Sequence, residues 1–266
     1  MFAQIKHMAI VSENYALMGK FYEAAFHMRT SRGARATNAV VVGDGYVGLN
    51  INPRRAGRQA GFDHFGFEVD DVETVFGRFR EKYPSVTVLK RPSNRPFAGL
   101  STHDPAGNVF DLSQKGMENR RDVYEDGEWK TDCSIHHFAL RTVMPEALAQ
   151  FYVDVFELQA QEKPAGDPNF YLTDGKVTLI IMPWNINDYL GSGIERPAIE
   201  HLGFKVESVE GFKKGLQSMI GANPRLSPSP VGAGPEGEAR LRLFQKCPYG
   251  KFQLADPDGV LIDVCE

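Results

Sequence analysis

The sequence predicts an α+β protein built from four copies of one βαβββ (strand–helix–strands) unit, paired into two tandem modules with curved, mostly antiparallel sheets. Two observations carry this prediction. Phrases of the first half return in the second half, and within each half a strand-like run precedes a helix-like run twice. We expect the sheets to curl around a cavity.

The internal repeat consists of matched phrases. "IKHMAI" (5–10) returns as "IHHFAL" (135–140), and "FYEAAF" (21–26) returns as "FYVDVF" (151–156), so both pairs share one offset. Two further pairs match at larger offsets, because the second module has gained length in two places. These pairs are "FDHFGFEV" (62–69) with "IEHLGFKV" (199–206), and "HDPAGNVFDL" (103–112) with "ADPDGVLIDV" (255–264).

The repeat also sets the domain boundaries. It predicts an N-terminal module at 1–115, a charged linker at 116–132 and a C-terminal module at 133–266. Within the second module, the Pro- and Gly-rich stretch 221–250 is too long for an ordinary connection. It is either a lid over a substrate pocket or a solvent loop, and both interpretations stay open.

The elements of each unit follow in a fixed order. Strand-like runs open the four units, at 4–11, 62–69, 134–142 and 199–206. Apolar residues at helical spacing come next and predict helices around 14–26, 72–83, 145–156 and 209–220. Short β-rich segments then follow, separated by turns such as "DPAG" and "DPDG", which suit a type I turn.

The composition excludes several classes of protein. Thirty Lys and Arg against 34 Asp and Glu give a net charge of −4 with no basic block, which argues against a nucleic-acid partner. No run approaches the roughly 18 apolar residues of a membrane span, and the start lacks the pattern of a secretory signal. Cys133, Cys247 and Cys265 form no C-x-x-C pair. We therefore expect reduced thiols in a cytoplasmic protein, without a cysteine zinc site.

Two histidines and one aspartate recur at equivalent places in the two modules. Each histidine falls in the first strand of a unit, and each aspartate falls near the end of the module's last strand. The triplets are His7, His64 and Asp111, and then His137, His201 and Asp263. Two imidazoles and a carboxylate on one side of a metal form the facial triad of non-haem Fe(II) sites, and the same set can hold zinc with a water. A duplicated, buried hydrogen-bonded network would give the same pattern.

His136 precedes His137 directly. Because successive side chains of a strand point to opposite faces, we expect only one of these two imidazoles to point into the cavity. The repeat offset selects His137, since it matches His7.

With these motifs, nearly the whole chain resembles the vicinal oxygen chelate superfamily, which includes glyoxalase I, fosfomycin- and bleomycin-resistance proteins and type I extradiol dioxygenases. The resemblance rests on the histidines of "IKHMAI", "IHHFAL", "DHFGFEV" and "EHLGFKV", and on the "DP-x-G" turn before an acidic strand. It implies four βαβββ units around a metal cavity. It also implies that His137, His201 and Asp263 are the primary ligands, with His7, His64 and Asp111 as a second or vestigial site.

Two departures from the family pattern affect the expected chemistry. The family's carboxylate ligand is usually glutamate, and both modules here use aspartate. Extradiol enzymes also keep a catalytic histidine between the two ligand histidines, whereas residues 138–200 contain none. The candidate proton carriers are therefore Tyr249, Tyr189 and His136.

By this resemblance the leading function is an Fe(II)-dependent extradiol-type dioxygenase, with O₂ and a small, aromatic or enediol-type substrate that binds the metal through vicinal oxygens. The second function is a glyoxalase-type lyase or isomerase that uses Zn(II), Ni(II) or Mn(II) to stabilise an enediolate. The third is a small-molecule binding or resistance protein without turnover. Related proteins often assemble further, so a homo-oligomer is possible.

Overall fold

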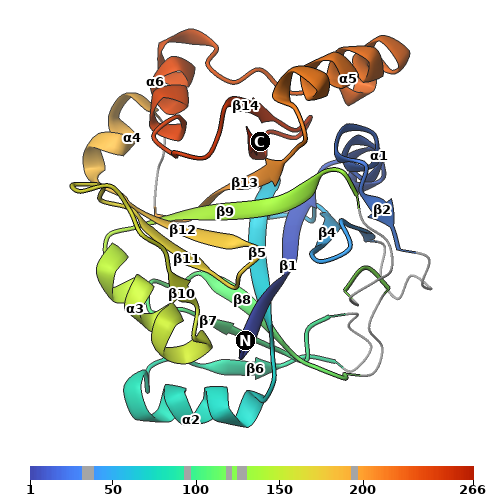
Figure 1. Cartoon of the computed structure of the whole chain (residues 1–266). Helices are drawn as coiled ribbons and strands as arrows, with labels where there is room; N and C mark the ends of the chain where they lie inside the picture. Colours follow the sequence, from blue (N-terminus) through green and yellow to red (C-terminus); the bar gives the residue numbers. More distant parts are fainter. Residues whose placement is uncertain (32–38, 93–96, 118–121, 125–130, 193–196) are drawn as a thin grey trace.

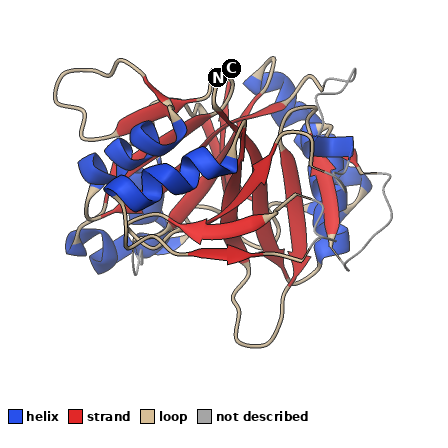
Figure 2. Ribbon diagram, turned by 90° about the horizontal axis from the view of Figure 1, so that it is seen from below, coloured by secondary structure: helices blue, strands red, loops and turns tan. Residues whose placement is uncertain are grey.

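The computed structural model of the chain describes residues 1–31, 39–92, 97–117, 122–124, 131–192 and 197–266. Each predicted module forms one curved sheet that does not close into a barrel (Figure 1). Figure 2 shows the strands in the middle of the molecule and the helices on its two sides. The α+β class and the two-module organisation of the sheets are thus confirmed.

The first module contains two complete βαβββ units. The first unit comprises β1 (Ala3–Ser12), α1 (Tyr15–Phe26), β2 (Arg29–Thr30), β3 (Val40–Gly43) and β4 (Gly48–Pro53). The second comprises β5 (Gly61–Val69), α2 (Val72–Lys82), β6 (Val88–Lys90), β7 (Leu100–His103) and β8 (Val109–Gln114). Their strands form one sheet in the order β2-β3-β4-β1-β5-β8-β7-β6.

The second module repeats this plan with additions. Its first unit comprises β9 (Ser134–Thr142), α3 (Pro145–Phe156), β10 (Gln159–Ala160), β11 (Phe170–Thr173) and β12 (Thr178–Pro183), followed by α4 (Ile186–Ser192). Its second unit comprises β13 (Ile199–Lys205), α5 (Val209–Ala222), β14 (Phe252–Ala255) and β15 (Leu261–Cys265). The sheet order is β10-β11-β12-β9-β13-β15-β14.

The fourth unit departs from the prediction, because it has two strands after its helix instead of three. A single bridge between Ser229 and Ala255 stands where the missing strand would pair. The stretch 221–250 fills the gap with a short 3-10 helix, η2 (Pro224–Leu226), and with α6 (Gly234–Phe244), which lies beside α4 (Figure 1). This stretch is therefore largely folded.

The two central strands of each sheet are antiparallel, and parallel neighbours flank them. β1 pairs with β5 and β9 pairs with β13 in antiparallel register, whereas β1–β4, β5–β8, β9–β12 and β13–β15 are parallel. One face of each sheet carries large apolar side chains such as Phe65 and Phe67, which are buried in the main core. The opposite face carries the histidines.

The first helix of each module packs on the strands of its own unit and also contacts the other module. From α1, the ring of Phe26 stacks on Phe204 of β13 with 3.9 Å between ring centroids. From α3, the ring of Phe156 stacks on Phe67 of β5 at 4.2 Å. One continuous apolar core therefore joins the two modules.

Reciprocal hydrogen bonds reinforce this docking. Tyr22 donates its hydroxyl to Asp256 (3.0 Å), and the matching Tyr152 donates to Asp104 (2.7 Å). Both aspartates are completely buried, and burial raises the pKa of each carboxyl. The turns predicted at "DPAG" and "DPDG" therefore also supply the carboxylates that hold the modules together.

A second reciprocal pair joins the module edges. The carboxylate of Asp174 accepts from the backbone N–H of Ile5 at 2.6 Å, and that of Asp44 accepts from Ile135 at 2.7 Å. These aspartates belong to "GDG" (43–45) and "TDG" (173–175), a further pair of matched phrases in the internal repeat. The repeat thus places the same contact on both sides of a pseudo-two-fold axis.

Within the described segments, no helix combines the length and the apolar character that crossing a bilayer requires.

Replacing Tyr152 by Phe tests the docking contact. We expect a loss of about 1–3 kcal/mol in the free energy of unfolding, because the buried Asp104 carboxylate loses a donor. Tyr83→Phe is the matched control, since Tyr83 donates to the partly exposed Asp154 at 2.9 Å and water can replace it. Its cost should stay below about 1 kcal/mol. Urea unfolding measures both, and equal costs would contradict the assigned role.

Replacing Asp256 by Asn tests the pH dependence of docking. Burial raises the pKa of Asp256 from 3.8 to about 6, so the folded chain holds the proton more tightly than the unfolded chain. Its stabilising contribution is complete below pH ~4 and is lost as the pH rises through about 6, with a total of about 3 kcal/mol. Between pH 5 and 7, the wild type should lose about 1 kcal/mol relative to Asp256→Asn in urea unfolding. A pH-independent difference would contradict this.

Candidate metal centre

The glycine in the repeated phrases makes room for a histidine on the neighbouring strand. Gly203 lies opposite His137 in the β9–β13 pair, and a Cβ at 203 would lie 2.0 Å from the His137 ring. Gly66 lies opposite His7 in the β1–β5 pair, and a Cβ there would lie 3.1 Å from the His7 Cβ. The phrases "HFGF" and "HLGF" thus place two histidines on one face of each sheet.

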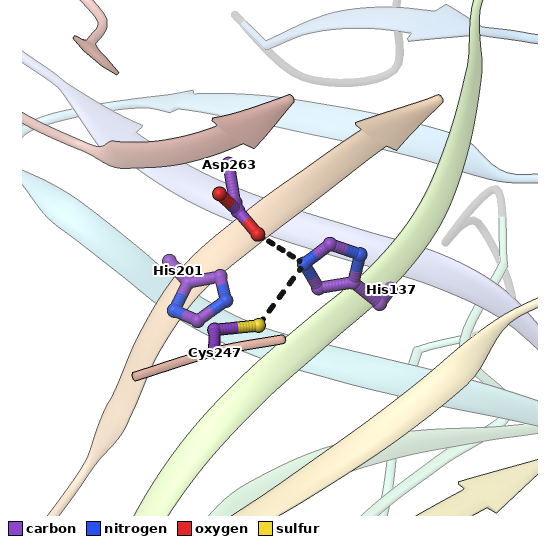
Figure 3. Close-up of side chains that lie close together, drawn as sticks. All are labelled: His137, His201, Cys247 and Asp263. Carbon is purple, nitrogen blue, oxygen red and sulfur yellow. Dashed lines mark hydrogen bonds and ion pairs between the residues drawn. The ribbon is translucent and has the colours of Figure 1, made fainter. Parts of the chain in front are cut away.

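In the second module the predicted triplet comes together and is joined by a cysteine. His137 Nε2 lies 3.2 Å from Asp263 Oδ2 and 3.9 Å from Cys247 Sγ. One donor atom from each of His137, His201, Cys247 and Asp263 lies within 4.8 Å of all the others. Figure 3 shows the four side chains pointing toward one another. All four residues are buried.

Two donor atoms of this cluster have no hydrogen-bond partner among the described residues. They are His201 Nε2 and Asp263 Oδ2, the latter lying near His137 without hydrogen-bond geometry. Leaving such buried atoms unsatisfied costs about 1–3 kcal/mol each. A divalent ion bound between them would satisfy both atoms, so these residues fit a metal.

The other atoms of the ligand side chains are held by further residues. Glu200 Oε2 lies 3.0 Å from His201 Nδ1, and Arg141 forms an ion pair with the same carboxylate. Gln253 donates to Asp263 Oδ1 at 2.9 Å. Such outer contacts fix the orientation of metal-binding side chains in known metal sites.

The ionisation of the cluster also suits a cation. Burial lowers the pKa of His137 to about 4, so its imidazole is neutral at pH 7. Burial alone would raise the pKa of Asp263, but contacts with His137 and His201 lower it overall. A neutral imidazole and an ionised carboxylate are the forms that bind a metal.

The acidic residue before each second histidine is a signal that our sequence analysis missed. Asp63 Oδ2 lies 2.8 Å from His64 Nδ1, just as Glu200 does for His201. The "DH" and "EH" pairs inside the repeated phrases are therefore carboxylate–histidine pairs.

The direction of the His136 side chain differs from our expectation. We expected His136 and His137 to point to opposite faces, yet their Nδ1 atoms lie 3.1 Å apart. The β9–β13 register skips His136 between Gly203 and Phe204, so the strand bulges there and alternation is broken. His136 is half-buried beside the cluster, and burial lowers its pKa.

The two candidate tyrosines lie in different places. The ring of Tyr249 lies 5.3 Å from that of His137, and its hydroxyl donates to Gln161 at 2.7 Å. Tyr189 lies on α4 with 51% of its surface exposed, so the structure does not bring it to the cluster.

The first-module triplet also comes together. His64 Nε2 lies 3.2 Å from His7 Nε2 and 3.4 Å from Asp111 Oδ2. Tyr124, from the 3-10 helix η1 (Asp122–Tyr124) in the linker, lies with its hydroxyl 2.8 Å from His7 Nδ1. The ring of Phe97 stacks on His7 at 4.7 Å. The described part of the linker thus covers this triplet.

This first triplet can satisfy its own polar atoms. Burial lowers the pKa of His7 to about 3. Burial also disfavours the charge on His64, but hydrogen bonds with Asp111 and Asp63 raise its pKa to about 9. A protonated His64 between two carboxylates satisfies these atoms without a metal, whereas His201 Nε2 and Asp263 Oδ2 have no hydrogen-bond partner among the described residues.

Cys247 was missed as part of the site. The sequence predicted three free thiols, which the structure confirms, but it gave no reason to place one beside the histidines. Cys247 lies at the end of the 221–250 stretch, which has no counterpart in the first module. No repeat could therefore point to it.

The family model for the Glyoxalase/Bleomycin resistance protein/Dioxygenase superfamily matches residues 4–112. The chain therefore carries a domain of this superfamily, which is the vicinal oxygen chelate group that its motifs resemble. No curated protein matches the chain in sequence.

Solved structures share the fold over the whole chain. The Mn(II)-bound glyoxalase from Novosphingobium aromaticivorans is 15% identical with a TM-score of 0.65, and the match covers 99% of this chain and 81% of that one. A catechol 2,3-dioxygenase is 11% identical with a TM-score of 0.63, covering 99% and 87%. At these identities the likeness shows the fold alone.

A third structure is longer. A xylose isomerase-like TIM barrel/4-hydroxyphenylpyruvate dioxygenase fusion protein is 12% identical with a TM-score of 0.60 over 99% of this chain. The chain spans 48% of that protein's length.

Replacing Gly203 by Ala tests the strand approach that builds the cluster. The added methyl group would overlap the His137 ring, so we expect metal affinity to fall by about tenfold or more. Gly215→Ala on α5 is the control, because no described atom lies within 4 Å of a Cβ there. Isothermal titration with zinc measures both variants. Unchanged affinity in Gly203→Ala would exclude His137 as a ligand.

Proposed function

We propose that the chain is a metal-dependent enzyme whose working centre is the His137, His201 and Asp263 triplet. The observation that carries this proposal is the pair of buried atoms His201 Nε2 and Asp263 Oδ2, which have no hydrogen-bond partner among the described residues. Both face the donor atoms of the same cluster, as expected of side chains that bind a cation. The first-module triplet, His7, His64 and Asp111, is a second or vestigial site in this proposal.

The reaction we propose first is an extradiol-type dioxygenation that uses Fe(II), O₂ and a small aromatic substrate. Two imidazoles and one carboxylate leave positions on a divalent ion where vicinal substrate oxygens bind and are polarised. The fold shared with a catechol 2,3-dioxygenase is compatible with this reaction.

The chain's own residues would orient the substrate and exclude water from it. Ala139, Tyr171, Ile180 and Met182 form an apolar cluster on the histidine face of the second sheet, next to Cys247 and Tyr249. Such a surface suits an aromatic ring and excludes water. Arg141 and Glu200 hold the His201 imidazole in place.

Proton transfer would fall to His136 and Tyr249. Both rings contact His137, with centroids 5.3 Å from it in each case. Tyr189 remains a third candidate only if α4 moves, because it lies exposed on that helix.

A glyoxalase-type lyase or isomerase with Zn(II), Ni(II) or Mn(II) is the second candidate. Two observations favour it. Residues 138–200 hold no histidine to serve as the dioxygenase base, and a thiol lies beside the cluster, which suits zinc better than iron. The three free cysteines are consistent with either enzyme working in the cytoplasm.

Metal content tests this proposal. The untagged protein, purified without oxygen, should contain about one divalent ion per chain by mass spectrometry. His201→Ala should lose that ion, because it removes a donor, whereas His64→Ala should keep it. Loss of the ion in His64→Ala alone would assign the metal centre to the first module. If neither the wild type nor a variant contains a metal, the remaining interpretation is a binding protein without turnover.

Oxygen dependence then separates the two reactions. A dioxygenase consumes O₂ with a catechol-type substrate and is inactive without it. A lyase or isomerase turns over 2-oxoaldehyde adducts equally well under anaerobic conditions.

A further inference from the structure

The end of the 221–250 stretch is fitted to the metal-binding residues at three points. The ring of Phe244 lies 4.7 Å from that of His201, and Cys247 Sγ lies 3.9 Å from His137 Nε2. At Gly250 the backbone passes so close to Asp263 that a Cβ would lie 1.4 Å from Oδ1. Each residue of the triplet is thus contacted by one residue of this segment.

The same segment is anchored to the residues that orient the ligands. Arg141, which pairs with Glu200, also donates to the carbonyl of Leu243 at the end of α6 (3.4 Å). Arg240 of α6 donates to the carbonyl of Ser192 at the end of α4 (2.9 Å). The position of Cys247 is therefore built into the second module.

Cys247 is placed as a ligand would be. Its thiol is buried, and its sulfur lies within 4.8 Å of the donor atoms of His137, His201 and Asp263. Two of those atoms have no hydrogen-bond partner among the described residues. One carboxylate leaves a divalent ion with one uncompensated positive charge, and a thiolate would neutralise it.

We propose that Cys247 is a fourth protein ligand of the second-module metal centre, so that two nitrogens, one oxygen and one sulfur surround the ion. The inference rests on the proposed metal centre. On binding, the thiol releases its proton to solvent and the sulfur joins the ion as a thiolate. Sulfur in the ligand set favours Zn(II) over Fe(II) and Mn(II).

This ligand also closes the centre. Four protein ligands complete a tetrahedral site, whereas a catalytic site keeps an open position. A substrate that binds through two oxygens would therefore displace Cys247 from a tetrahedral ion or raise the coordination number of the ion above four.

Cobalt spectroscopy tests the sulfur ligand. The metal-free chain is loaded with one Co(II), and the near-ultraviolet thiolate-to-cobalt charge-transfer band is recorded. We expect the band in the wild type and its loss in Cys247→Ser. Cys133→Ser and Cys265→Ser are matched controls that should keep it, since Cys265 lies near His136 and His137, and Cys133 near His27 and Asp132.

The outcomes separate this inference from the proposed function. Cobalt bound through His201 without a thiolate band overturns the inference and leaves the metal centre standing. A band lost in Cys265→Ser or Cys133→Ser, and kept in Cys247→Ser, assigns the sulfur elsewhere and also overturns it. No cobalt bound by the wild type defeats both proposals.

X-ray absorption of the zinc-loaded wild type needs no variant. We expect one sulfur at about 2.3 Å from zinc, with nitrogen and oxygen at about 2.0–2.2 Å. A shell of nitrogen and oxygen alone would overturn the fourth ligand even if Cys247→Ser fails to fold.

Discussion

The close approach of the two central strands of each sheet determines where the chemistry of this protein lies. The imidazole of His137 on one strand lies over the backbone of the neighbouring strand at Gly203. Only glycine leaves space for the ring at this position, because a Cβ there would overlap it. The antiparallel register then brings His201 to the same face as His137. The parallel strand β15 adds Asp263 opposite Gly203. A slip of one residue would turn these side chains to the core face.

The two modules share this geometry and differ in what surrounds it. In the first, linker residue Tyr124 contacts His7, and a protonated His64 lies between two carboxylates. In the second, two donor atoms have no hydrogen-bond partner in the described part of the chain, and a thiol lies beside them. Duplication thus preserved the strand framework, while segments outside the repeat set the properties of each triplet.

The sequence was sufficient to predict the units and the two triplets because each is written twice. A histidine on an apolar strand is ambiguous alone, whereas its recurrence at matched positions indicates that the fold uses that position twice. The lack of a repeat also explains which features the sequence did not predict. Cys247 and α6 belong to a stretch that occurs once, so no comparison within the chain could place them.

Local rules also failed where tertiary structure overrides them. Alternation along a strand predicted that His136 points away from His137, and the bulge in β9 places the two rings together. The "DPAG" and "DPDG" phrases were correctly expected as turns. That their aspartates accept from tyrosines of the other module depends on packing, which a turn pattern does not encode.

The contacts that the first helix of each module makes with the other module have a consequence for how the protein folds. Because Phe26 of α1 stacks on β13 and Phe156 of α3 stacks on β5, each half buries part of its apolar face against the other half. The two halves should therefore melt in one cooperative transition, and a chain cut within the linker should stay associated as long as it stays folded.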